Sequence, residues 1–402
     1  MGRLESLSDW LKWQNSFHHQ EIDLGLDRVQ VVYQKLFSDR PPFKIITIAG
    51  TNGKGSTAAF IEGIYLQTTF KVGVFSSPHI LEYNERFRID GKNVDDHIII
   101  RAFEEIESKR GDVSLTYFEF STLAALLIFR NLQIDIAILE VGLGGRLDSV
   151  NVTSPDLTII TSIDIDHSEY LGNTRERIAL EKAGIMRRGI TCLCGDQTPP
   201  RSLSDEAKKI GSKLQFIKKP YSGSIKMSGT HQQINAQVAV EAINCLKPYF
   251  DVSSNQIIKG LKMVRLPGRF EKVLYSGRLI ILDVAHNPAA VNELKNTLKH
   301  LNLKINAVYS SMKDKDIKQI VRNINEFVSI WHFAPMNSIR SSSLEELEKI
   351  FIKYENSKGF ETVSSAFNSM LKYKDKKPIL VFGSFQIISE VSDLILNLPE
   401  ND

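Results

Sequence analysis

Short runs of apolar and β-branched residues alternate along the chain with longer segments in which apolar residues recur at helical spacing. Nearly continuous apolar runs are typical of strands that are covered on both faces, as in parallel sheets. The runs predict strands over 44–50, 71–76, 134–141, 157–163, 190–194, 278–285, 305–310, 328–334 and 378–384. The segments between them predict helices over 55–67, 117–131, 174–187, 233–247, 289–299 and 344–354.

This alternation of strands and helices predicts an α/β protein with mostly parallel sheets. A length of 402 residues suggests two or three domains. The best boundary candidate is the segment LPGRF, where Pro267 and Gly268 interrupt the pattern and a new strand–helix series follows. Residues 197–232 are rich in Ser, Lys, Gly and Pro, and the pattern assigns them no role.

Composition and charge exclude several classes of protein. Hydrophobic residues make up 42% and charged residues 24%, which excludes a long disordered or fibrous chain. The net charge of +3 does not favour nucleic acid or an anionic membrane as a partner, and no apolar stretch approaches the ~18 residues of a membrane span. Three cysteines are too few for a disulfide framework and form a poor zinc set. We therefore expect a cytoplasmic protein.

The strongest local signal lies in ITIAGTNGKGST, where the first predicted strand ends and a helix begins. A glycine-rich loop in that position lets backbone N–H groups converge on phosphate oxygens, and the helix N-terminus adds positive potential. Lys54 would add a cation, and Ser56 or Thr57 a hydroxyl for Mg²⁺. The spacing departs from the general phosphate-loop pattern, because Gly55 separates Lys54 from Ser56. A turn without a ligand is the alternative, but the strand–loop–helix context favours nucleotide binding.

Polar side chains follow several of the predicted strands. Glu140 ends an apolar strand and precedes a glycine-rich loop, His167 follows the next strand, and the motif DVAHNP places Asp283 and His286 before a helix. Ligands of open α/β sheets bind at the carboxyl ends of strands, where a carboxylate can hold Mg²⁺. A solvated strand end and a structural histidine are the alternatives. Lys182, near the end of a predicted helix, is interpreted from the pattern alone as a surface lysine.

Eight motifs occur along the chain in this order: GTNGKGS, SSPH, ILEVGLGGRLDSVN, DHSEYLG, EKAGIM, HQQINA, LPGRFE and DVAHNP. Their order resembles that of the folylpolyglutamate synthases and dihydrofolate synthases of the Mur-ligase superfamily. The resemblance extends from DLGLDRV at 23–29 to FGSFQIISEV at 382–391. DLGLDRV and GDVSLTYFE are most similar to the bifunctional bacterial branch, which adds L-glutamate to dihydropteroate and to reduced folates.

The resemblance implies a specific domain organisation. Residues 1–267 would form an N-terminal P-loop ATPase domain on a mostly parallel sheet, the ATP-binding central domain of Mur ligases. Residues 268–402 would form a smaller C-terminal Rossmann-like α/β ligase domain. ATP contacts would come from both domains, so closure about Pro267 and Gly268 would assemble the site.

The resemblance also implies roles for individual residues. Lys182 matches the lysine that becomes carbamylated in this superfamily, and this match replaces its interpretation as a surface lysine. A carbamate would convert the cation of Lys182 to an anion able to bind a second Mg²⁺. The matches to the ATP contacts are Gly50, Thr51, Asn52, Gly53, Lys54, Gly55, Ser56, Asn235, Arg269 and Asp283. The matches to the metal ligands are Ser77, Glu140, His167 and Lys182, and the catalytic set is Lys54, Lys182 and His286. The residues expected on the pterin side are Leu26, Asp27, Arg28, Thr116, Leu147, Asp148 and Ser149.

The implied cofactors are ATP and Mg²⁺, with room for a monovalent cation, and the implied substrates are dihydropteroate, reduced folates and L-glutamate. The enzyme would transfer the γ-phosphate of ATP to the substrate carboxylate, and the amine of glutamate would displace phosphate from the acyl phosphate. We expect a monomer that binds neither nucleic acid nor membranes. Two alternatives remain open: a Mur-type ligase for a cell-wall precursor, against which LTYFE and the GKGS form of the loop argue, and a nucleotide-binding module without ligase activity.

Overall fold

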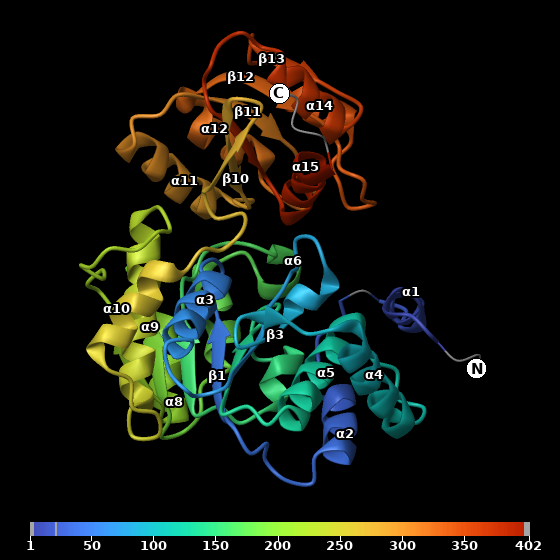
Figure 1. Cartoon of the computed structure of the whole chain (residues 1–402), viewed down its shortest axis with the longest axis vertical. Helices are drawn as coiled ribbons and strands as arrows, with labels where there is room; N and C mark the ends of the chain where they lie inside the picture. The colour runs from blue at the N-terminus through green and yellow to red at the C-terminus, as the bar shows by residue number, and fades with distance from the viewer. Residues whose placement is uncertain (1–3, 21, 398–402) are drawn as a thin grey trace. The chain divides into compact units, whose positions relative to one another are not determined.

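The computed structural model describes residues 4–20 and 22–397, which divide into two compact units of mixed α/β architecture (Figure 1). The first unit comprises the residues up to 226 together with 233–264, and the second comprises 227–232 together with the residues from 265 onward. Each unit has its own sheet and its own cluster of buried apolar side chains. The predicted α/β class with mostly parallel sheets is confirmed.

The first unit is built on an eight-stranded sheet with the strand order β4-β3-β2-β5-β1-β6-β7-β8. The strands β2, β5, β1, β6, β7 and β8 are parallel to one another. Strand β3 pairs antiparallel with both β2 and β4. The strands are β1 (Lys44–Ala49), β2 (Val72–Phe75), β3 (Phe87–Ile89), β4 (Lys92–Asn93), β5 (Ile136–Glu140), β6 (Leu157–Ile160), β7 (Thr191–Cys194) and β8 (Lys213–Phe216).

Strand β1 lies inside this sheet, between β5 and β6. Ile48, near the end of β1, is in register with Glu140 of β5 and with Ile159 of β6. The carboxyl ends of the three strands therefore lie side by side, and the loops that follow them start at one edge of the sheet. Every described residue of β5 and β6 is buried, which explains why their sequences are nearly continuous apolar runs.

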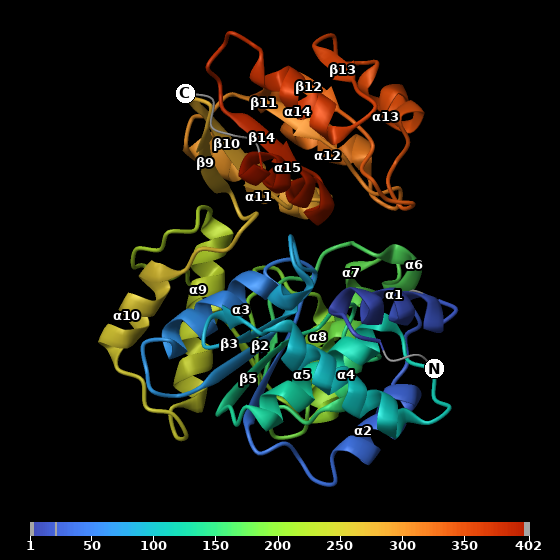
Figure 2. The ribbon, with the colours of Figure 1, turned by 45° about the vertical axis from the view of Figure 1, so that its right-hand side comes forward.

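Helices cover the sheet of the first unit in separate groups (Figures 1 and 2). The apolar helix α5 packs with α1, α2 and α4, while α3 packs against α10. The contact between α3 and α10 is close because glycines meet there: a Cβ at Gly260 would lie 2.5 Å from the carbonyl oxygen of Gly63. The helices are α1 (Leu7–Phe17), α2 (Asp27–Leu36), α3 (Lys54–Tyr65), η1 (Tyr83–Arg86), α4 (Asp96–Arg110), α5 (Tyr117–Asn131), η2 (Ser149–Val152), α6 (Ser168–Leu171), α7 (Arg175–Ala183), α8 (Arg201–Ile210), α9 (Thr230–Leu246, in this unit from 233 onward) and α10 (Ser254–Met263).

The second unit has a six-stranded sheet with the order β13-β12-β11-β14-β10-β9, which is parallel except for the edge strand β9. Asn287 caps the first helix through its side chain and Pro288 opens it, as the motif DVAHNP predicts. The strands are β9 (Glu271–Tyr275), β10 (Arg278–Asp283), β11 (Ile305–Tyr309), β12 (Val328–Phe333), β13 (Ser357–Gly359) and β14 (Ile379–Phe382). The helices are α11 (Pro288–His300), α12 (Ile317–Ile324), η3 (Asn325–Phe327), α13 (Leu344–Phe351), α14 (Val363–Leu371) and α15 (Phe385–Asn397).

The hydrophobic pattern predicts the central elements and misses the peripheral ones. All nine predicted strands and all six predicted helices are present, although the helix predicted over 174–187 already ends at Ala183. The pattern misses the short or exposed strands β3, β4, β8, β9 and β13, because they bury too few side chains to produce a continuous apolar run. The unassigned region 197–232 contributes α8, β8 and the start of α9. Within the described residues, no helix is both long and apolar enough to span a membrane.

Candidate active site

The loop between β1 and α3 has the compact geometry of a phosphate-binding loop. Gly53, at φ +87°, caps α3 in a left-handed conformation that favours glycine. The side chain of Lys54 folds back, and its Nζ donates to the carbonyl oxygens of Gly50 (3.0 Å) and Thr51 (3.4 Å). A Cβ at Gly50 would lie only 1.8 Å from Oγ1 of Thr161, so the backbone needs glycine there. The loop thus places a cation and a helix N-terminus at the end of β1.

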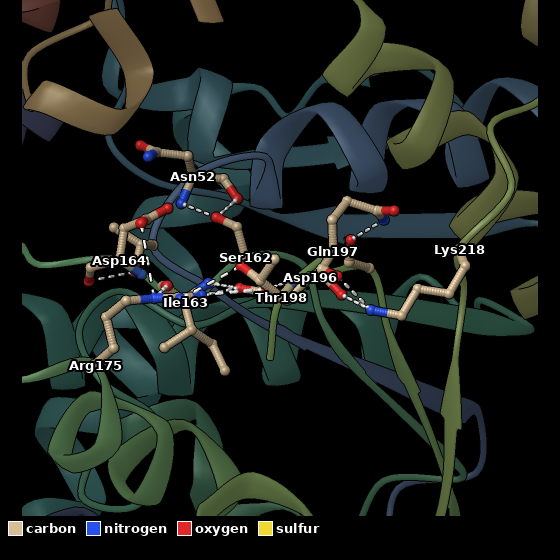
Figure 3. A network of polar contacts seen from close by, with 11 residues as sticks. Asn52, Ser162, Ile163, Asp164, Arg175, Asp196, Gln197, Thr198 and Lys218 are labelled. Atoms are coloured by element: carbon tan, nitrogen blue, oxygen red, sulfur yellow. Dashed lines mark hydrogen bonds and ion pairs between the residues drawn. The ribbon is translucent and has the colours of Figure 1, made fainter. Parts of the chain in front are cut away.

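The segment after β6 holds the first half of this loop in place (Figure 3). The backbone N–H of Thr51 donates to the carbonyl oxygen of Ser162 (2.8 Å), and that of Asn52 donates to Oγ of Ser162 (3.0 Å). Oγ1 of Thr161 donates to the carbonyl oxygen of Asn52 (2.6 Å). The loop conformation therefore depends on the neighbouring strand as well as on its own glycines.

Two hydroxyl groups at the start of α3 fit a nucleotide–metal site. The side chains of Ser56 and Thr57 are almost fully buried, at 1% and 0% exposure, and neither hydroxyl has a hydrogen-bond partner among the described residues. A buried hydroxyl without a partner is costly unless a ligand completes it. Both residues lie in the first turn of the helix, where a phosphate loop presents a hydroxyl to Mg²⁺.

Glu140 and Ser77 meet across the sheet. The carboxylate of Glu140, which is 5% exposed at the end of β5, accepts a 3.3 Å hydrogen bond from the backbone N–H of Ser77, just after β2. A buried carboxylate at the carboxyl edge of a parallel sheet suits a hard cation such as Mg²⁺. These two predicted metal ligands therefore lie together.

His167 follows β6 and sits immediately before α6. It adopts a left-handed backbone conformation (φ +50°), which is uncommon for residues other than glycine, and its N–H donates to Oδ1 of Asp166 (2.9 Å). Asp166 itself is buried. Strained residues of this kind cluster at functional sites because the surrounding structure must hold them in place.

Lys182 is fully buried near the end of α7, so its interpretation as a surface lysine is wrong. The glycine-rich loop after β5 presses against this helix end: a Cβ at Gly145 would lie 2.9 Å from the carbonyl oxygen of Glu181. Burial, together with the nearby charge of Lys54, lowers the pKa of Lys182 to about 7, although Asp166 acts in the opposite direction. A neutral amine near pH 7 is a nucleophile, which is the form that reacts with carbon dioxide.

The three segments predicted for the pterin side are joined by hydrogen bonds. The guanidinium of Arg28 in α2 pairs with Glu119 of α5 (3.2 Å), whose carboxylate also accepts from the backbone N–H of Thr116 (2.7 Å). Thr116 in turn caps α5 through its side chain. The hydroxyls of Thr122 in α5 and Ser149 lie 2.6 Å apart.

The remaining predicted pterin residues lie beside these contacts. The carbonyl oxygen of Leu147 accepts from the backbone N–H of Gly25 (3.2 Å), directly before Leu26 and Asp27 at the start of α2. Asp148 caps η2, and burial raises the pKa of Asp148 to about 6. The structure therefore brings Leu26, Asp27, Arg28, Thr116 and the 147–149 segment into one region.

In the second unit, two of the predicted residues lie beside Phe385, the first residue of α15. The guanidinium of Arg269 lies 5.1 Å from the centre of the Phe385 ring, and the ring of His286 lies 6.2 Å from it. Nδ1 of His286 is 2.8 Å from the carbonyl oxygen of Val284. Asp283, at the end of β10, accepts from two backbone N–H groups, and burial raises its pKa. Asn235 belongs to the first unit, where its side chain borders Gly53.

Sequence reasoning missed two residues next to this site, Arg175 and Asp196. Their guanidinium and carboxylate groups are 3.1 Å apart, and Asp196 is 5% exposed at the end of β7. The available signal was the position of Asp196 directly after a predicted strand, the same signal that identified Glu140.

Comparison with known families agrees with this geometry. Residues 48–216 match the Mur ligase middle domain, and residues 268–385 match the Mur ligase glutamate ligase domain. The fold and the site thus define a Mur ligase. The dihydrofolate synthase/folylpolyglutamate synthase of Escherichia coli K12 is 38% identical over 97% of this chain and 95% of its own length. That of Haemophilus influenzae is 36% identical over 96% of each chain. The chain belongs to the dihydrofolate synthase/folylpolyglutamate synthase family.

Solved structures of the family have the same fold over nearly the whole chain. The E. coli FolC in complex with DHPP and ADP superposes with a TM-score of 0.91 at 37% identity, covering 98% of both chains. The Yersinia pestis enzyme complexed with AMPPNP and Mn ion gives a TM-score of 0.90 at 36% identity, covering 98% of this chain and 99% of the other.

The burial of Lys182 predicts a pH-dependent stability. Because its pKa of about 7 lies below the ordinary 10.5, the unfolded chain binds more protons than the folded chain between these values. The contribution of Lys182 to the stability of the bare protein should therefore fall as the pH drops from 10.5 to 7, and stay low below 7. In buffer depleted of carbon dioxide at pH 6.5, Lys182→Met should stabilise the first unit by on the order of 5 kcal/mol.

Urea unfolding at pH 6.5 and pH 9.5 measures this effect, with the exposed Lys259 in α10 mutated to Met as the matched control. The gain from Lys182→Met should shrink at the higher pH, and Lys259→Met should show no such trend. An equal effect of Lys182→Met at both values would contradict the assigned pKa.

Proposed function

We propose that this chain is an ATP-dependent ligase that joins L-glutamate to dihydropteroate and to tetrahydrofolate. The observation that carries the proposal is the 38% identity over 97% of the chain to an enzyme named for both reactions. The phosphate loop, the Ser77–Glu140 contact and the pterin-side segments supply the matching chemistry on this chain's own residues.

A divalent cation fits the residues present at the carboxyl edge of the first sheet. The proposed ligands are Ser77, Glu140, His167 and, as a carbamate, Lys182. The unpartnered hydroxyl of Ser56 provides a further oxygen at the phosphate loop. A bound Mg²⁺ would neutralise charge on the phosphates of ATP. Structures of relatives carry Mn together with AMPPNP, which supports a divalent metal and a nucleotide at the corresponding site.

The chemistry requires activation of a carboxylate, because a carboxylate is a poor acylating agent. Transfer of the γ-phosphate of ATP to the substrate carboxylate gives an acyl phosphate, and the amine of L-glutamate then displaces phosphate to form the amide. The protein contributes positioning and charge neutralisation. The loop from Gly50 to Ser56 and the N-terminus of α3 would hold the triphosphate. Lys54 would move from its present carbonyl partners to the phosphate oxygens.

The pterin would bind at the region formed by Leu26 to Arg28, Thr116 and Leu147 to Ser149. Support comes from the hydrogen bonds that link these segments, since a shared framework fixes their spacing. The buried Asp148, whose pKa is raised to about 6, offers a carboxyl group that changes its protonation state near neutral pH.

Further parts of the proposal concern the second unit and the state of the protein. Asn235, Arg269 and Asp283 would contact ATP, and His286 would act near the phosphates. We assign residues 1–267 to the ATP-binding domain and 268–402 to the ligase domain. We also propose that Lys182 carries a carbamate and that a monovalent cation serves as a further cofactor. The protein would be a monomer located in the cytoplasm. The buried amine of Lys182, whose pKa is lowered to about 7, supports the carbamate.

The two alternatives are not favoured. A ligase for a cell-wall precursor would be expected to resemble cell-wall enzymes, whereas the relatives reported above are folate enzymes along nearly their full length. A nucleotide-binding module without ligase activity has no need for the pterin-side framework around Thr116 and Glu119.

The function is tested by mass spectrometry of the products after incubation with ATP, Mg²⁺ and L-glutamate, together with either dihydropteroate or tetrahydrofolate. We expect the mass of each acceptor to rise by one glutamate residue, with phosphate released only when glutamate is present. Phosphate release that is independent of glutamate, without a ligated product, would favour the nucleotide-binding module instead.

Removal of the proposed metal ligand Glu140 should slow the reaction without unfolding the protein. We expect Glu140→Ala to lower kcat by about 100-fold or more, because the buried carboxylate is lost from the metal site. Steady-state assays across a range of Mg²⁺ concentrations measure the change, and circular dichroism checks the fold. The matched control is Glu104→Ala, an exposed glutamate of α4, which should behave as wild type. Wild-type turnover by Glu140→Ala would reject the assignment.

The proposed carbamate is tested by chemical rescue. Lys182→Ala should lose activity, and short carboxylates such as formate or acetate should restore part of it by occupying the position of the carbamate. The measurement is the initial rate against carboxylate concentration, with wild type as the control for general salt effects. Full activity of Lys182→Ala without any added carboxylate would remove the carbamate from the mechanism.

A further inference from the structure

The side chains of Arg175 and Asp196 surround the backbone of one residue, Ile163, in the segment after β6 (Figure 3). Oδ2 of Asp196 accepts from the N–H of Ile163 (2.7 Å), and Nε of Arg175 donates to its carbonyl oxygen (2.6 Å). The guanidinium of Arg175 also bonds both carboxylate oxygens of Asp196, at 3.2 and 3.1 Å. Both hydrogen-bonding groups of a single residue are therefore held by one ion pair.

The residues on either side of Ile163 contact the phosphate loop directly. Ser162 bonds to the backbone of Thr51 and Asn52, as described above. The N–H of Asp164 donates to Oγ1 of Thr51, and that hydroxyl donates to the carbonyl oxygen of Asp164, both at 3.0 Å. A displacement of Ile163 would therefore be transmitted to the loop through both of its neighbours.

The ion pair is itself fixed by the end of β7 and by the region 197–232. Oδ1 of Asp196 accepts from the N–H of Thr198 (2.8 Å). Nζ of Lys218, which follows β8, donates to the carbonyl oxygens of Asp196 (2.9 Å) and Gln197 (2.7 Å). Because Asp196 is buried and makes charge-assisted hydrogen bonds, it has little freedom to move. This contact gives a positioning role to a region that the sequence pattern left unassigned.

We propose that Arg175 and Asp196 form a positioning pair that sets the phosphate loop for nucleotide binding by holding the backbone of Ile163. The inference rests on the proposed function, because it assumes that the loop binds ATP. Neither side chain needs to touch the nucleotide. The pterin-side contacts around Arg28, Thr116 and Ser149 are made by other residues, so the pair should affect ATP and leave dihydropteroate unaffected.

Two conservative substitutions test the pair. The carboxylate of Asp196 accepts from the backbone N–H groups of Ile163 and Thr198. In Asp196→Asn one of these two N–H groups faces an amide nitrogen, which cannot accept its hydrogen bond. Arg175→Lys keeps the charge but cannot bond Ile163 and Asp196 together in the planar geometry of a guanidinium. The control variants are Glu105→Gln and Arg130→Lys, which alter a 2.8 Å ion pair between α4 and α5 whose arginine is as exposed as Arg175, although its carboxylate is more exposed than that of Asp196.

The first measurement is the dissociation constant of the magnesium complex of AMP-PNP, by calorimetry well below the melting temperature of each variant. The second is the KM for dihydropteroate at saturating ATP. We expect each variant of the pair to weaken AMP-PNP binding about tenfold or more and to change the KM for dihydropteroate less than about twofold. The double variant should be no weaker than the worse single variant, because both substitutions break the same contact.

A change in the dissociation constant below about fivefold would overturn the inference, and so would an equal loss in both measurements, because a general loosening of the fold affects both substrates. If Asp196→Asn does not fold, Arg175→Lys decides by the same criteria. Wild-type protein separates this inference from the proposed function: if wild type does not bind AMP-PNP, the proposed function itself is wrong.

Discussion

The close approach of the β1 and β6 exits is the constraint on which the active site depends. At Gly50 the space for a side chain is already filled by Thr161, so the phosphate loop can leave β1 only with a bare backbone. The parallel register places the end of β5 beside them, which aligns Glu140 with the same edge. This one arrangement positions the helix N-terminus at the loop, the buried hydroxyls of α3 and the proposed metal ligands after the adjacent strands.

The site concentrates buried ionisable groups that a purely structural core would avoid. Lys182, Glu140 and Asp166 are all largely removed from water, and burial of charge is unfavourable unless partners compensate for it. The surrounding apolar sheet and helices must supply the stability that these groups take away. Such a site retains buried ionisable groups at a cost in stability, which is a known trade-off between stability and function.

The sequence alone predicts the central strands and the loops at their ends, because burial on both faces leaves an unmistakable apolar run and glycine marks a close backbone approach. The phosphate loop, Glu140 and His167 could be found in this way. The burial of Lys182 could not be derived from its helix, since it results from packing against the loop around Gly145, which is distant in sequence. The pair Arg175 and Asp196 was missed for the same reason: their contact joins α7 to the end of β7, and its target is a backbone rather than a side chain.

The hydrogen bonds of Arg175 and Asp196 to the backbone of Ile163 have a consequence for how these positions evolve. Both contacts are made to the backbone of Ile163, so its side chain can be substituted by other apolar side chains that fill the same space. A substitution at position 175 or 196, in contrast, requires a compensating substitution at the other position. Among homologues of this chain, we expect positions 175 and 196 to co-vary with each other. We expect position 163 to show no co-variation with either of them.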